Sequence, residues 1–311
     1  MIELPAFERL REARSVLLLG AGGGYDILGA VPLFAALRAL GKIVHLGGVS
    51  FTSLDALPGC QSDEKHACLF AVRGASAVSD RYCPEPWLAR WLEKSGHDQP
   101  VWAFAKVGVR PLRAALADLV ERLAADAVVL VDGGVDILLR GDETSIGTPA
   151  EDLTSLCAVS GLEVPTRLIM CLGFGAELRD GISHAQVLER VADLQTRGGF
   201  LGAVSLQTQT APGAAYLEAL SYVLEGQRSQ RGSHVQGSVR AAMSGQFGGP
   251  NSDTWVSPLT ALCWFFSVPE VAGSHLFLSH LEPTETIWDV TTRVRGCRST
   301  LAVRGRSSIP L

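Results

Sequence analysis

Short apolar runs alternate with stretches of helical periodicity along most of the chain. Each run is nearly continuous, without the polar alternation of a half-exposed strand, which is typical of strands buried on both faces of a parallel sheet. The predicted strands are Val16–Leu19, Lys42–Leu46, Val101–Val107, Ala127–Val131, Leu168–Leu172 and Phe200–Leu206. Their alternation with helices predicts an α/β protein with a mostly parallel sheet flanked by helices.

Helix signals fill the intervals between these strands. Prolines stand at first-turn positions, where a missing amide costs little, and the run from Thr148 to Glu151 has the form of a capping box. The predicted helices run from Pro32 to Leu40, over Trp87–Leu92, from Pro111 onward, from Thr148 to Ser160, from Ser183 to Leu194, and from Pro212 onward.

The remaining segments complete a one-domain prediction. Asp55–Gly96, which contains scattered prolines and glycines, is interpreted as an insertion over the edge of the sheet. Near the C-terminus the pattern predicts an apolar helix over Pro258–Val268 and an amphipathic helix over Thr284–Arg295. No linker or internal repeat is present, so we expect a single domain over residues 1–311. Residues 1–226 would carry the sheet, and residues 227–311 would form a helical C-terminal cap.

Composition narrows the class of protein. The 311 residues are 47% hydrophobic and 19% charged, as in an ordinary globular chain, and the formal net charge of −5 gives no basic surface for nucleic acid. No apolar run has the length of a membrane span, and the N-terminus lacks the apolar core of a signal peptide. The 7 cysteines show no CxxC spacing. The expected location is therefore the cytoplasm.

The first predicted strand ends in a glycine-rich turn that carries an acid. Gly22, Gly23 and Gly24 precede Tyr25 and Asp26, but Tyr25 stands where the GxGxxG pattern of dinucleotide-binding proteins requires a small residue. A carboxylate at a helix start also competes with a pyrophosphate for the same amides. Asp26 is expected to accept hydrogen bonds from ligand hydroxyls or to bind a hard cation; the structural alternative is that it only caps the turn.

A second acidic turn follows the strand Ala127–Val131. Acids that cluster at one strand end repel one another unless a cation, an arginine or a hydroxyl-rich ligand interacts with them. The alternative is structural, with some of the acids bonding turn amides and the others solvated. The residues of this turn are Asp132, Gly133, Gly134, Asp136, Arg140, Asp142 and Glu143, with Arg140 as the internal counter-charge.

Other catalytic arrangements lack their sequence signals. The histidines form no HxH or HExxH pair, which disfavours a histidine metal centre. No GxSxG elbow and no GxxxxGK[ST] loop occurs, which disfavours acyl transfer and P-loop nucleotide hydrolysis. The capping box explains Glu151, whereas Asp152 either faces a cleft or favours the helix start. Glu177 follows a glycine pair at a strand end and is a further candidate.

These motifs together resemble the uncharacterised family known as domain of unknown function 1152. The likeness lies in Gly22–Asp26 with Gly29 and Pro32, Pro84-Glu85 with Leu88, Lys106 with Gly108, Val131–Asp136, Arg140–Glu143 and Gly147–Asp152, and continues in Pro258-Leu259 and Trp264-Phe265. The resemblance implies a single Rossmann-like α/β protein and brings no established reaction. The stretch Gln227–Asp253 is the most divergent part.

The preferred hypothesis is a small-molecule enzyme whose cleft joins the turns Gly22–Asp26, Gly47–Thr52 and Asp132–Glu143. It would be a hydrolase or lyase acting on a ribosyl or other polyhydroxylated substrate, with Asp26 and Asp132 as the catalytic carboxylates. A Mg²⁺ or Ca²⁺ ion would be held by Asp26, Asp132 and Asp136. The predicted ligand-binding residues are Gly22, Gly23, Gly24, Gly133, Gly134, Asp136, Arg140, Asp142 and Glu143.

Two rival functions remain open. One is a nucleotide- or NAD(P)-binding enzyme with a non-standard glycine loop, and the other is a binding protein without turnover. In each case the expected partner is a small molecule rather than a nucleic acid or a membrane. The sequence leaves the formation of homo-oligomers open.

Overall fold

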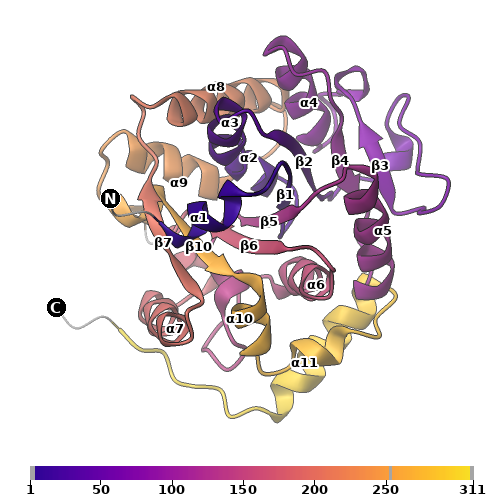
Figure 1. Ribbon diagram of the computed structural model, residues 1–311. Coiled ribbons are helices and arrows are strands. Elements are labelled where there is room, and N and C mark those ends of the chain that lie inside the picture. Colours follow the sequence, from indigo (N-terminus) through magenta and orange to yellow (C-terminus); the bar gives the residue numbers. More distant parts are fainter. Residues whose placement is uncertain (1–3, 252–253, 309–311) are drawn as a thin grey trace.

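The computed structural model, which describes residues 4–251 and 254–308, is built around an eight-stranded sheet (Figure 1). Its strand order is β3-β4-β2-β1-β5-β6-β10-β7, and β4, β2, β1, β5 and β6 run parallel. β3 and β10 run antiparallel to their neighbours. The strands are β1 (Ser15–Gly20), β2 (Ile43–Val49), β3 (Leu69–Val72), β4 (Val101–Phe104), β5 (Ala127–Asp132), β6 (Thr166–Cys171), β7 (Phe200–Ser205) and β10 (Leu262–Ser267); β8 (Gly248–Asn251) and β9 (Thr254–Val256) form a separate hairpin.

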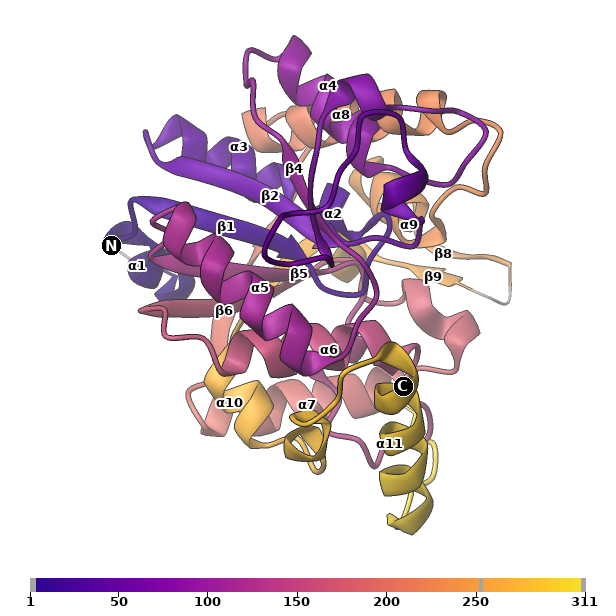
Figure 2. The same cartoon turned by 90° about the vertical axis from the view of Figure 1, so that its right-hand side faces the viewer.

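Helices cover both faces of this sheet, giving three layers (Figures 1 and 2). One face carries α1 (Pro5–Arg11), α2 (Asp26–Gly29), α3 (Val31–Ala39), α4 (Glu85–Lys94) and α8 (Ala211–Gly226). The other carries α5 (Val109–Arg122), α6 (Pro149–Ser160), α7 (His184–Thr196), α10 (Val268–Gly273) and α11 (Ile287–Thr300). α9 (His234–Met243) packs beside β9, and the short 3-10 helices are η1 (Leu54–Ala56), η2 (Gly74–Ser76), η3 (Asp136–Leu138), η4 (Ala176–Asp180), η5 (Pro258–Ala261) and η6 (Leu278–Leu281). Within the described residues, no helix is both long and apolar enough to cross a bilayer.

The central strands explain the apolar runs of the sequence. Every residue of β1 and of β5 is buried. Leu17 and Leu19 of β1 pack in one core layer, while Val16 and Leu18 pack in the other, because successive side chains of a strand point to opposite faces. The predicted α/β architecture with its mostly parallel sheet is therefore confirmed.

The apolar run Pro258–Val268 is a correction, because it does not form the predicted helix. Pro258–Ala261 is a single 3-10 turn, and Leu262–Ser267 is β10, which lies between β6 and β7. A strand buried on both faces has a continuous apolar pattern, which periodicity alone does not distinguish from a buried helix. The region after residue 226 thus adds a strand to the main sheet as well as the C-terminal helix α11.

Of two further local predictions, the insertion at the sheet edge is confirmed and the capping box is wrong. The insertion Asp55–Gly96 does lie at the sheet edge, where it supplies the outermost strand β3 and the helix α4. α6 begins at Pro149 as expected, but the predicted capping box does not form, because the Thr148 side chain makes no cap hydrogen bond. Glu151 instead pairs with Lys106, at 2.7 Å between Oε1 and Nζ.

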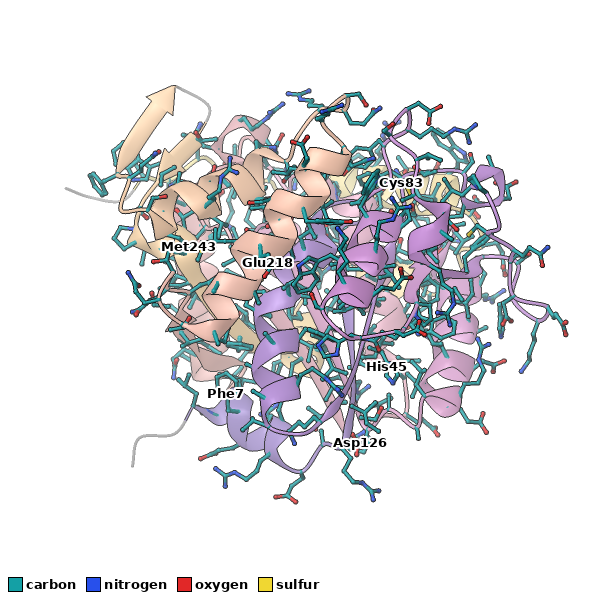
Figure 3. All side chains as sticks on the ribbon, turned by 90° about the horizontal axis from the view of Figure 1, so that it is seen from above. Phe7, His45, Cys83, Asp126, Glu218 and Met243 are labelled. Atoms are coloured by element: carbon teal, nitrogen blue, oxygen red, sulfur yellow. The ribbon has the colours of Figure 1, made fainter. Side chains whose placement is uncertain are left out.

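The two ends of the sheet differ in character. At the amino end of β5, the Asp126 carboxylate accepts hydrogen bonds from the backbone amides of Arg14 and Ser15. Cys83 lies toward the opposite side of the molecule (Figure 3). At the carboxyl end, β1 leads to helices on one face and β5 leads to α6 on the other face. Because the two connections diverge, a crevice opens between them, which is where ligands of open α/β sheets bind.

Candidate functional site

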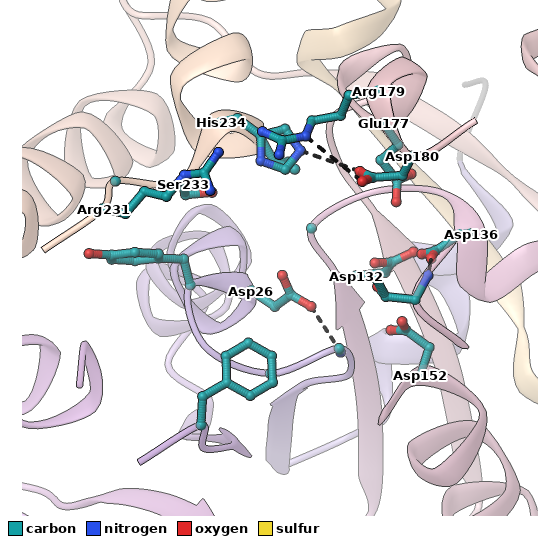
Figure 4. Close-up of a pocket in the computed structure, with 18 of the residues that line it drawn as sticks. Asp26, Asp132, Asp136, Asp152, Glu177, Arg179, Asp180, Arg231, Ser233 and His234 are labelled. Atoms are coloured by element: carbon teal, nitrogen blue, oxygen red, sulfur yellow. Dashed lines mark hydrogen bonds and ion pairs between the residues drawn. The ribbon is translucent and has the colours of Figure 1, made fainter. Parts of the chain in front are cut away.

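A cavity of about 490 Å³ lies in this crevice (Figure 4). Its size is within the range of small-molecule binding sites. Acids from β5, η3, α6 and η4 form one side of it, and tyrosine and phenylalanine rings form another. The lining residues are Gly22, Gly23, Tyr25, Asp26, Phe51, Tyr82, Asp132, Gly133, Asp136, Thr148, Asp152, Glu177, Arg179, Asp180, Arg231, Gly232, Ser233, His234 and Val235.

The turn after β1 places Asp26 at the centre of the cavity. Gly23 has φ +90°, a left-handed conformation that favours glycine, and a side chain there would come within 2.9 Å of the Val49 carbonyl oxygen. The turn folds back on itself, so that the backbone amide of Gly22 donates a hydrogen bond to Asp26 Oδ2 at 2.9 Å. The glycines therefore fix the position of the carboxylate.

The turn after β5 meets the first turn at this carboxylate. A Cβ atom on Gly133 would overlap Asp26 Oδ1, so only glycine lets the β5 turn approach so closely. A Cβ on Gly134 would overlap the carboxylate of Glu177 in the same way. The expected convergence of the two glycine-flanked acidic turns at one edge of the sheet is confirmed.

Asp132 and Asp136 of the second turn are buried and are partly satisfied by the backbone. Asp132, at the end of β5, is 3% exposed and accepts two long hydrogen bonds, from the Ile137 amide at 3.4 Å and from the Cys171 thiol at 3.9 Å. Asp136 accepts a hydrogen bond from the Thr148 amide at 3.0 Å. Each carboxylate retains acceptor capacity that these amides do not use.

Asp152 brings a third carboxylate to Asp26 and Asp132. One ligand oxygen from each of these residues lies within 4.8 Å of the other two. Asp152 is 2% exposed, and its Oδ1 has no hydrogen-bond partner in the described part of the chain, although burying an unpaired carboxylate oxygen is costly. The expected metal set was Asp26, Asp132 and Asp136; the three carboxylates that the structure brings together are those of Asp26, Asp132 and Asp152.

Asp136 instead lies near Glu177. Glu177 is held by the Val135 amide, which donates to its Oε2 at 2.6 Å. Burial, with added repulsion from Asp136, raises the pKa of Glu177 well above its usual range, and burial also raises the pKa of Asp136. The protonated forms of these two acids are therefore favoured relative to those of isolated carboxyl groups in water.

Burial and mutual repulsion control the ionisation of these acids. Burial, with added repulsion from Asp136, raises the pKa of Asp26 to about 7. Burial, followed by repulsion from neighbouring carboxylates, also raises the pKa values of Asp132, Asp152 and Glu177 well above the usual range. No Lys or Arg among the described residues forms an ion pair with any member of this group. The acidic side of the cavity is therefore stable only with bound protons or a bound cation.

Several predicted ligand-binding residues do not line the cavity, which corrects those predictions. Gly24 lies under Phe51 and Tyr82, and Gly134 lies behind Glu177. The remaining three, Arg140, Asp142 and Glu143, are covered by the C-terminal segment: Arg140 pairs with Asp142 at 3.0 Å, and Arg304 contacts both Asp142 and Glu143.

The cavity also contains residues outside the main predicted set. Asp152 and Glu177 were named as weaker candidates, at a helix start and a strand end, and both line the cavity. Arg231 and His234 come from the stretch with the weakest pattern, so their presence in the cavity depends on how α9 packs. Phe51, at 47% exposure, belongs to the predicted cleft turn Gly47–Thr52, whereas Tyr82 on the same aromatic side was not predicted.

The geometry also bears on the NAD(P) alternative. The Gly22 amide, which would bind a pyrophosphate in a Rossmann site, already donates to Asp26. A side chain on Gly22 would lie 2.7 Å from Asp26 Oδ2 and 2.8 Å from Asp152 Oδ1, so carboxylates occupy the space beside this turn. The space that a pyrophosphate would take beside this turn is thus occupied by Asp26 and the buried Asp152.

Comparison with known protein families identifies a family for this chain but no reaction. A family model described as "Protein of unknown function (DUF1152)" matches residues 17–299. The match covers both glycine turns, the carboxylate cluster and β10. No curated protein matches the chain significantly.

Proposed function

We propose a function for this chain, which belongs to the DUF1152 family of proteins of unknown function, from the chemistry of its cavity. It is a metal-dependent enzyme, a hydrolase or lyase acting on a ribosyl or other polyhydroxylated small molecule. The observation that carries this proposal is the approach of one ligand oxygen from each of Asp26, Asp132 and Asp152 to within 4.8 Å of the other two.

The donor set suits a hard divalent cation. Three carboxylates supply oxygen ligands, which Mg²⁺ and Ca²⁺ prefer, and no histidine belongs to the cluster formed by the described residues. The unpartnered Oδ1 of Asp152 is the kind of buried atom that such an ion would satisfy. A bound cation supplies Lewis acidity and lowers the pKa of a coordinated water or hydroxyl group.

The carboxylates beyond this cluster supply acid–base chemistry. Hydrolysis needs a group that takes a proton from water, and elimination needs one that takes a proton from carbon. Asp136 and Glu177 line the same cavity, and burial raises the pKa values of both carboxyl groups, which suits them to accept and donate protons. Asp26, the only partly exposed member of the metal cluster, faces the substrate and orients its hydroxyls.

Calorimetric titration with Mg²⁺ and Ca²⁺ tests the proposal. The wild-type protein should bind one of these ions, and Asp152→Asn should weaken binding by about tenfold or more, since it replaces a charged ligand by a neutral one. Glu151→Gln is the matched control, because Glu151 is the adjacent acid and is paired with Lys106. Turnover of ribosides and polyols should require the ion that binds. Absence of binding, or equal binding by the two variants, contradicts the proposal.

A further inference from the structure

Positive and negative side chains are kept apart within the cavity. Arg179, Arg231 and His234 lie across from Asp132, Asp136 and Asp152 (Figure 4). Arg231 makes no ion pair or hydrogen bond with any residue that the structure describes. Among the described residues, the ion pair of Arg179 is with Asp180, at 3.8 Å between Nε and Oδ1. Asp180 Oδ2 also lies 3.7 Å from His234 Nε2.

This separation is unusual for groups that share one small cavity. Arginine and carboxylate side chains form strong, charge-assisted hydrogen bonds when they meet in a partly buried site. Here Arg179 has a long ion pair with Asp180, and neither arginine pairs with Asp26, Asp132, Asp136 or Asp152 among the described residues. Arg231 therefore remains available to a ligand, and Arg179 retains guanidinium donors that Asp180 does not use.

The start of α9 adds further donors on the positive side. Ser233 caps this helix by accepting a hydrogen bond from the Gln236 amide at 3.2 Å. The amides of His234 and Val235 come earlier in the helix and have no acceptor within it. Gly232–Val235 line the cavity, so the positive end of the helix dipole faces its interior.

We infer that the substrate of this site carries a phosphate group, bound by Arg179, Arg231 and the first turn of α9. The inference rests on the proposed function, in which the hydroxyl-bearing part of the same molecule reaches the acidic side and its cation. Two guanidinium groups and free helix amides offer more donors than the two oxygens of a carboxylate accept, whereas a phosphate monoester has three terminal oxygens. The unpartnered Asp152 Oδ1 at the opposite side of the cavity independently indicates a ligand there.

The dimensions of the cavity agree with such a molecule. Its volume of about 490 Å³ is sufficient for a phosphorylated monosaccharide, with the phosphate at one end and the sugar hydroxyls at the other. The exposed ring of Phe51 and the ring of Tyr82 lie beside this volume, 6.2 Å apart between centroids. They supply apolar surface between the two polar ends.

Binding of inorganic phosphate, ribose 5-phosphate and ribose, measured by calorimetry with and without Mg²⁺, tests the inference. Wild-type protein should bind ribose 5-phosphate at least about tenfold more tightly than ribose. Arg231→Gln should weaken binding of both phosphates by about tenfold and leave Mg²⁺ binding unchanged. Arg228→Gln is the matched control, since Arg228 is three positions away, 79% exposed and paired with Glu225.

The possible outcomes separate the two proposals. Equal affinity of the wild type for ribose and ribose 5-phosphate, or equal affinity of Arg231→Gln and Arg228→Gln for phosphate, overturns the phosphate inference. Phosphate binding that depends on Arg231 supports it, even if Mg²⁺ and Ca²⁺ fail to bind and the proposed metal-dependent function is wrong. Mg²⁺ binding that depends on Asp152, without a preference for phosphate, leaves only the proposed function standing.

Discussion

Asp26 is a residue whose ionisation should affect the stability of the fold. Burial and repulsion raise its pKa to about 7, whereas in an unfolded chain Asp titrates near about 3.9. The folded state therefore binds the proton more tightly, and the contribution of this group to stability is largest at acid pH and falls as pH rises between these two values.

Asp26→Asn should remove this dependence in metal-free protein. The difference in unfolding free energy between the variant and wild type is expected to be near zero at acid pH and to grow to about 4 kcal/mol by about pH 8. Urea unfolding of both proteins in EDTA across this range measures the difference. Asp98→Asn, at an aspartate with an 85% exposed side chain, is the control. A difference that does not change with pH would show that Asp26 is not perturbed.

Gly133 is expected to be intolerant of substitution for a steric reason. Gly133→Ala places a methyl group against Asp26 Oδ1, so it should destabilise the protein by about 1–3 kcal/mol and displace the carboxylate from the cation site. Gly237→Ala is the control, because a Cβ there meets nothing within 4 Å and alanine favours a helix. Denaturation and Mg²⁺ titration should separate the two variants; equal behaviour would contradict the close approach.

Individual site residues differed in how far the sequence could predict them. Asp26 and Asp132 directly follow predicted parallel strands, and such strands end at one edge of a sheet, so their meeting was predictable. Asp152 belongs to the cluster because α6 crosses that edge at a particular angle, which periodicity does not specify. Arg231 and His234 depend on the packing of α9, in a stretch where local pattern and tertiary position are nearly unrelated.

At the scale of elements, the C-terminal segment fastens the loop that carries Arg140, Asp142 and Glu143. Arg298 of α11 donates to the carbonyl oxygens of Gly141 and Glu143, at 2.8 and 2.6 Å. The Arg304 amide donates to the Asp142 carbonyl oxygen at 2.7 Å. The acids that the sequence suggested for ligand binding thus serve to hold this segment.

Arg298→Ala tests that structural role. Loss of its hydrogen bonds should cost about 1–3 kcal/mol and speed amide exchange in residues 140–145, while Mg²⁺ affinity stays unchanged because the loop lies outside the cavity. Arg295→Ala, an exposed position on the same helix, should have little effect. The assignment is wrong if the two variants unfold alike, or if Arg298→Ala loses Mg²⁺ binding.

The elements themselves were predictable where strands and helices alternate. Lengths of four to eight residues and glycine-rich ends identified β1, β2, β5 and β6. The prediction for the segment that forms β10 was wrong because the nearby Pro258 resembles a helix start, although the three consecutive aromatic residues of β10 favour a strand. The antiparallel insertion of β10 is decided by long-range pairing with β6 and β7, which a local pattern does not contain.

At the scale of the whole molecule, the proposed cation should link separate parts of the fold. Asp26 follows β1, Asp132 ends β5 and Asp152 belongs to α6, so an ion bound by all three opposes their separation on unfolding. Mg²⁺ or Ca²⁺ at about 100 times its dissociation constant should raise the unfolding free energy by about 2.7 kcal/mol. Thermal and urea unfolding of wild type and Asp152→Asn measure this, and equal stabilisation of both proteins would argue for a different binding site.

The position of β10 has a consequence for how the protein is made. β7 ends at Ser205 and leaves the ribosome well before β10 begins at Leu262, yet β10 must come to rest between β7 and β6. A nascent chain that has not yet reached Leu262 exposes the edge of β6, to which β7 can bind in the wrong place. The eight-stranded sheet can therefore be completed only after synthesis has passed Ser267, well after β7 has emerged.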